Sequence, residues 1–126
     1  MEAPDLANAY TAAWNTGQPD AVASFFATDG SIIINGGTPW RGRDGVAQMA
    51  QGFYTDIPDL TLVNEGVRAA GRHVIYLWSF SGTHRESRKA VNVSGWEEWN
   101  LDAEGQISTS LGWFDPVDYA NQTKVD

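Results

Sequence analysis

The sequence predicts an α+β domain in which helices come first and a curved, mostly antiparallel sheet follows. In the first half, apolar residues recur at spacings of three and four, which is typical of amphipathic helices. In the second half, aromatic and β-branched residues gather in strand-like runs separated by turn residues. With 126 residues, of which 42% are hydrophobic, the chain can enclose one core, so a single domain over 1–126 is expected.

Three helices and one short strand are expected before the sheet. The first helix is predicted over Asp5–Asn15, the second over Pro19–Ala27, and the third within "GRDGVAQMAQGFY", where Asp44 is a plausible N-cap. Between the second and third helices, "SIIING" indicates a brief apolar strand closed by glycines.

Four longer strands follow. They are "DLTLVNEGVRAAG", "HVIYLWSFSGTH", "AVNVSGWEEWNLD" and "QISTSLGWFD", and their order suits an antiparallel meander. The last one leads into "DPVDYANQ", where Asp115 has two interpretations. It could act as a base at the strand end, but a cap is favoured because Asp before Pro is a common helix opening.

Composition narrows the classes of function. The net charge is −8, which disfavours nucleic acid and anionic membranes as partners. There is no cysteine, and the two histidines, His73 and His84, lie at opposite ends of one strand, so no metal site is expected. The N-terminus lacks the features of a signal peptide, which indicates a cytoplasmic protein.

The stretch "GWEEWN" sets two adjacent acids between two tryptophans. In a strand, Gly95, Glu97 and Trp99 share one face, while Trp96 and Glu98 belong to the other. One glutamate is therefore a candidate for burial, and a carboxyl group enclosed by apolar walls tends to stay protonated.

The chain resembles the NTF2-like superfamily, and within it the SnoaL-like polyketide cyclases and ketosteroid isomerases. The matching segments are "YTAAWNTGQPDAVASFFATDGSI", "WRGRDGVAQM" and "WNLDAEGQISTSLGWFD". The resemblance implies a cone-shaped fold in which a curved sheet wraps the N-terminal helix around a deep apolar cavity. It also implies a homodimer packed through the sheets, and chemistry without a cofactor.

The same resemblance implies the catalytic residues. Tyr10 falls where the isomerases keep the tyrosine of their oxyanion hole, and Glu97 falls where they keep a protonated acid. Glu97 is then expected to point into the cavity and Glu98 to the outer face. The isomerase base has no counterpart, because its position is taken by Ile34.

Cavity-lining residues follow from strand alternation and from the helix faces. The small ones are expected to leave volume for a ligand, although the aromatic ones also suit a solid core. The predicted substrate-binding residues are Trp14, Phe53, Tyr76, Trp78, Phe80, Val93, Gly95, Ser110, Gly112 and Phe114.

Three functions compete at this point. The first is a cofactor-independent enzyme of the cyclase or isomerase type, acting on a small apolar carbonyl compound through Tyr10 and Glu97. The second is a non-catalytic module that binds a small apolar molecule, and the third is a protein interaction domain that uses outer-face tryptophans such as Trp96. Glu97 also has a purely structural interpretation, as a partner of Arg68, Arg72 or Tyr10.

Overall fold

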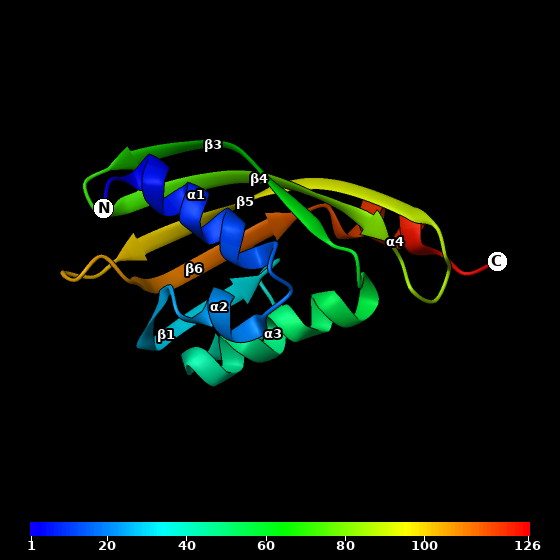
Figure 1. Ribbon diagram of the computed structural model, residues 1–126, viewed down its shortest axis with the longest axis horizontal. Coiled ribbons are helices and arrows are strands. Elements are labelled where there is room, and N and C mark those ends of the chain that lie inside the picture. Colours follow the sequence, from blue (N-terminus) through cyan, green and yellow to red (C-terminus); the bar gives the residue numbers. More distant parts are fainter.

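One curved, open sheet of six strands organises the molecule, in the order β2-β1-β6-β5-β4-β3 (Figure 1). The computed structural model describes all residues, 1–126. The elements are α1 (Ala3–Trp14), α2 (Pro19–Ala23), β1 (Phe26–Ile34), β2 (Trp40–Arg41), α3 (Gly42–Asp56), β3 (Thr61–Ala70), β4 (His73–Thr83), β5 (Ala90–Leu101), β6 (Ile107–Phe114) and α4 (Pro116–Thr123).

The four long strands β3 to β6 form the antiparallel meander that the sequence predicts. The fifth long strand, β1, joins β6 in parallel and pairs on its other edge with the short β2. The sheet is therefore mixed but mostly antiparallel, and the predicted α+β class is confirmed.

The helices lie against one face of this sheet (Figure 1). The first helix, α1, packs on β3 and buries Tyr10 and Trp14 toward the sheet, as its apolar periodicity predicts. The third helix, α3, packs on β1 and α2. On β4, the alternate residues Val74, Tyr76 and Trp78 are buried, so they face the helices. None of the four helices combines the length and hydropathy that a membrane span requires.

The predicted second helix is too long. It ends at Ala23 rather than Ala27, and Phe26 already belongs to β1. The spacing of Val22, Phe25 and Phe26 fits a helix, but tertiary pairing overrides it. The backbone N–H of Ile107 donates to the Phe25 carbonyl at 2.9 Å, and fully buried Phe26 pairs with Ile107.

Of the two predicted caps, one is wrong and one is confirmed. The third helix begins at Gly42, because β2 leads directly into it, so the N-cap position is Arg41 and Asp44 lies in the first turn. Its negative charge is favourable in the first turn, near the positive end of the helix dipole. Asp115 is the N-cap of α4, and its side chain accepts hydrogen bonds from the backbone N–H groups of Val117 and Asp118.

Candidate functional site

Glu97 lies in the middle of β5 on the face toward the helices, and only 6% of its surface is exposed. Its Oε1 atom accepts hydrogen bonds from Ser110 Oγ at 2.8 Å, from Trp99 Nε1 at 3.0 Å and from the Tyr10 hydroxyl at 3.1 Å. Its Oε2 atom has only the Tyr10 hydroxyl, at 3.2 Å. The neighbouring Glu98 lies on the opposite face, where the Trp113 indole donates to it. The predicted division of the two glutamates is confirmed.

Strand register brings these donors together. Ser110 of β6 pairs with Trp99 of β5, so the two side chains lie on the same face of the sheet. Glu97, two residues before Trp99, also lies on this face. Tyr10 reaches Glu97 from the third turn of α1, which packs across the sheet. Three separate segments therefore supply donors to one carboxyl group.

Burial raises the pKa of the Glu97 carboxyl above its ordinary value. The hydrogen bonds from Trp99, Ser110 and Tyr10 act in the opposite direction but do not cancel that effect. Neither predicted arginine partner is present, since the side-chain donors to Glu97 are Tyr10, Trp99 and Ser110 and no salt bridge includes this carboxyl group. Of the structural partners expected for Glu97, the structure thus provides Tyr10 and no cation.

Tyr10 is fully buried among aromatic residues. Its ring contacts those of Phe25, Phe26, Tyr76 and Trp99, with a centroid distance of 5.0 Å to Trp99. Burial and the Glu97 carboxyl beside it raise the pKa of the Tyr10 hydroxyl well above its ordinary value. Its hydroxyl therefore stays protonated and directs its hydrogen bond to Glu97.

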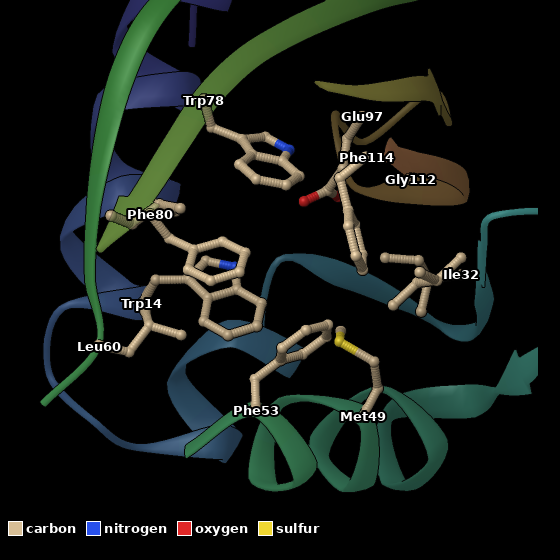
Figure 2. A pocket seen from close by; sticks show the side chains of 12 residues that line it. Trp14, Ile32, Met49, Phe53, Leu60, Trp78, Phe80, Glu97, Gly112 and Phe114 are labelled. Atoms are coloured by element: carbon tan, nitrogen blue, oxygen red, sulfur yellow. The ribbon is translucent and has the colours of Figure 1, made fainter. Parts of the chain in front are cut away.

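A hollow of about 50 Å³ opens beside Glu97 (Figure 2). This is room for roughly three or four water molecules, whereas sites for drug-sized ligands measure about 300–1,000 Å³. The hollow suits a compact group of few atoms. Glu97 is the only titratable residue in its wall, and the lining residues are Trp14, Ile32, Ile34, Met49, Phe53, Leu60, Leu62, Trp78, Phe80, Glu97, Gly112 and Phe114.

The predicted substrate-binding residues divide into two groups. Those that line the hollow are Trp14, Phe53, Trp78, Phe80, Gly112 and Phe114. The others lie outside its wall: Tyr76 and Val93 belong to the buried core, Ser110 donates to Glu97, and Gly95 lies beneath Trp78. A ligand contact for any of them stays a prediction.

The two strand glycines of the site differ in the space around them. A Cβ atom at Gly95 would lie 2.2 Å from the Trp113 carbonyl oxygen and 2.7 Å from the Trp78 ring. A Cβ atom at Gly112 would meet Ile34 and Glu97 at 3.7 and 3.8 Å, which is ordinary contact. The volume expected at Gly95 is therefore filled by Trp78, while Gly112 borders open space.

Sequence reasoning missed part of the wall, namely Ile32, Met49, Leu60 and Leu62. Met49 belongs to the apolar stripe of α3, which the sequence already indicated, and Ile32 alternates with Ile34 on β1. Ile34 itself borders the hollow, at the position where the resemblance places the isomerase base. No group of three or more His, Asp or Glu side chains is placed to hold a metal ion.

The chain matches the model of the SnoaL-like domain family over residues 7–109. This match covers most of the chain, and the protein belongs to that family. No curated protein matches the sequence.

Solved structures confirm the NTF2-like, ketosteroid isomerase-like fold. A hypothetical protein with this fold from Catenulispora acidiphila, in complex with trimethylamine, is 18% identical, with 99% of this chain and 96% of that chain covered and a TM-score of 0.89. A candidate polyketide cyclase from Xanthomonas campestris is 22% identical, with 96% of each chain covered and a TM-score of 0.84. A candidate SnoaL-like polyketide cyclase from Jannaschia is 14% identical, with 98% of this chain and 92% of that chain covered and a TM-score of 0.85. At these identities the likeness shows the fold alone.

Proposed function

We propose that this protein binds a small, mostly apolar carbonyl compound in the hollow and that Glu97, in its neutral form, donates a hydrogen bond to the carbonyl oxygen. The observation that carries the proposal is the setting of Glu97. It is the single titratable group in an otherwise apolar wall, it has no cationic partner, and burial raises its pKa. A neutral acid in such a place can polarise a carbonyl group.

The hydrogen bonds around Glu97 indicate which oxygen carries the proton. The indole N–H of Trp99 can only donate, so Oε1 must present a lone pair to it. The same atom also accepts from Ser110 and Tyr10. The acid proton therefore belongs on Oε2, the oxygen with the fewest partners, and Tyr10 acts as a positioning residue that holds the carboxyl group.

The proposed reaction is of the cyclase or isomerase type, in which negative charge develops on the carbonyl oxygen and Glu97 stabilises it. The residue at the position of the isomerase base is Ile34, and its side chain cannot accept a proton from the substrate. Any base for the reaction belongs to the substrate or to solvent.

Glu97→Gln tests this role. The amide retains a carbonyl oxygen for the three donors and an N–H in place of the acid proton, but this N–H is a far weaker acid and stabilises developing negative charge on the ligand oxygen less well. We expect exchange of the α-hydrogens of a cyclic ketone into D2O, followed by NMR, to fall by about 100-fold or more, with affinity nearly unchanged. Glu98→Gln on the outer face is the matched control. Equal exchange rates in wild type and Glu97→Gln would remove the proposed acid role.

A non-catalytic binding module is the second candidate, because the hollow holds one titratable group where many enzymes use two. In that case cyclic ketones bind saturably, wild-type protein produces no exchange above the buffer rate, and Glu97→Gln changes only affinity.

A small ammonium is the competing ligand. The similar structure from Catenulispora acidiphila holds trimethylamine, and aromatic rings around one carboxylate can hold such a cation. An ammonium requires Glu97 to be ionised, whereas burial favours its neutral form. Trimethylammonium should therefore bind more weakly than a ketone of similar size, and its affinity should fall further as the pH is lowered.

We also expect a homodimer through the outer sheet face, where large apolar side chains face away from the helices. Val63 is 46% exposed, Trp96 40% and Leu111 37%, and such a patch commonly marks an interface. Sedimentation velocity at micromolar concentration is the measurement, and a monomer under these conditions contradicts the expectation.

A further inference from the structure

The Trp78 side chain lines the hollow, and its indole N–H is buried without a hydrogen-bond partner. The side chain as a whole is only 8% exposed, so water outside the fold does not satisfy this donor. Buried donors are almost always paired, because an unpaired one loses its hydrogen bonds to water without replacement. An unpaired donor beside a hollow therefore indicates the chemistry of what the hollow receives.

Gly95 determines where this donor points. Trp78 and Gly95 are cross-strand neighbours, and an ideal Cβ atom at Gly95 would lie 2.7 Å from both Cζ2 and Cη2 of the indole. The ring thus lies across β5 with its Cζ2 edge against the glycine. In an indole, Nε1 is attached to the carbon next to Cζ2, so the N–H belongs to the same edge. Figure 2 shows this nitrogen on the side of the ring that faces Glu97.

Trp14 carries a second buried and unpaired indole N–H in the wall. Its place in the fold differs, because Trp14 belongs to α1, whereas Trp78 lies on β4 and pairs with Gly95, two residues before Glu97 on β5. Trp78 and Glu97 therefore share one face of the sheet, and Trp78 is the donor placed to act together with Glu97.

We propose that Trp78 is the second hydrogen-bond donor to the ligand oxygen, acting beside Glu97, and that it makes the hollow selective for an oxygen acceptor over an ammonium or a plain hydrocarbon. The proposal rests on the proposed carbonyl-binding function and names the residue that completes it. Two donors match the two lone pairs of one carbonyl oxygen. Tyr10 is occupied with Glu97 and has no part in the wall, so the pair that faces the ligand is Glu97 with Trp78.

The test uses three compact probes of similar shape. Cyclopentanone carries the oxygen, methylenecyclopentane replaces it with a CH2 group, and trimethylammonium carries a positive charge. Each is titrated into the full-length protein at pH 6, and ¹H–¹⁵N spectra of the six tryptophan indoles report the contacts. We expect cyclopentanone to bind about five-fold or more tightly than methylenecyclopentane and to move the Trp78 indole proton downfield.

Two variants test this donor. Trp78→Phe removes the unpaired N–H and is expected to reduce the preference for the ketone over the alkene by about five-fold. Trp113→Phe, which removes an indole N–H on the outer sheet face, is the matched control and should leave this preference unchanged. If Trp78→Phe does not fold, the wild-type indole shift alone decides the question.

The outcomes distinguish this inference from the function on which it rests. If the ketone is preferred over the alkene, but the Trp78 proton does not move or Trp78→Phe keeps the preference, the role of Trp78 is wrong and the function stands. If wild type shows no preference for the ketone, or prefers trimethylammonium, both proposals fail. A preference that depends on Trp78 and not on Trp113 supports both.

Discussion

The two ends of the core beside α1 have similar composition but different packing. At one end, Tyr10, Tyr76 and Trp99 are completely buried, and the Tyr76 and Trp99 rings stack at 5.2 Å. We call these three residues the solid end. Each of their polar atoms is paired: the Tyr10 hydroxyl and the Trp99 indole with Glu97, and the Tyr76 hydroxyl with Thr11.

At the other end, aromatic rings surround the hollow and contact one another mainly edge to face. Trp14 meets Phe53 at a centroid distance of 6.2 Å, and Phe53 meets Phe114 at 6.3 Å. We call the lining of the hollow, apart from Glu97, the hollow end. Its two indole N–H groups, those of Trp14 and Trp78, are unpaired. Both ends are aromatic, so hydrophobicity does not distinguish them. The hydrogen-bond pairing of their polar atoms does distinguish them, and Glu97 lies between the solid end and the hollow end.

The largest expected effect comes from removing the group that joins the two ends. Glu97→Leu leaves three buried donors without an acceptor, and each such donor costs about 1–3 kcal/mol. We expect the free energy of unfolding to fall by about 3 kcal/mol or more, measured by urea denaturation. Glu98→Leu on the outer face is the control, with a change of about 1 kcal/mol or less. Equal losses in the two variants would contradict the distinction between the faces.

Two glycine-to-alanine substitutions compare a strand position with no room for a methyl group, Gly95, with one that has room, Gly112. Gly95→Ala forces a Cβ atom against the Trp113 carbonyl and the Trp78 ring, so we expect a loss of about 2–3 kcal/mol in unfolding free energy. Gly112→Ala has room for its methyl group and should change stability by about 0.5 kcal/mol or less. The same methyl group reduces the hollow, so Gly112→Ala should weaken cyclopentanone binding. Thermal and urea unfolding of both variants test this order.

The same substitution, tryptophan to phenylalanine, can be made at the solid end and at the hollow end, and its effects on stability compared. Trp99→Phe removes buried ring volume and a hydrogen bond to Glu97, whereas Trp78→Phe removes a donor that has no partner. We expect Trp99→Phe to cost about 1–2 kcal/mol more than Trp78→Phe, because the lost hydrogen bond adds to the lost volume. Trp99→Phe should also raise the Glu97 pKa further, since the indole lowers it. Similar stabilities of the two variants would remove the distinction between the ends.

The pH dependence of stability gives the smallest expected effect. The folded-state pKa of Glu97 is raised, so the unfolded chain releases this proton at a lower pH than the folded protein. The contribution of Glu97 to stability is complete below its unfolded pKa and is lost as pH rises through the folded value. Its slope is at most about 1.4 kcal/mol per pH unit. Urea unfolding from pH 4 to pH 8 should show this slope in wild type and not in Glu97→Gln.

Sequence reasoning predicted the fold class and much of the site, because both depend on short-range patterns. Period-two alternation in β5 separates Glu97 from Glu98, and the same alternation places Trp78 and Phe80 on the helix side of β4. The capping role of Asp115 also follows from local chemistry. Errors arose where long-range pairing decides, as at Phe26, which joins β1 through its pairing with Ile107.

The amino-acid pattern alone is enough to predict a mostly antiparallel sheet covered by helices and the burial of one of two adjacent acids. These results follow from the periods of the helix and the strand, which are local properties of the backbone. The folded molecule adds that Tyr10, Trp99 and Ser110 all donate to Glu97, and that Trp78 occupies the space over Gly95. Those contacts depend on strand register and on the packing of α1 across the sheet, and residues far apart in sequence carry no local signal of either.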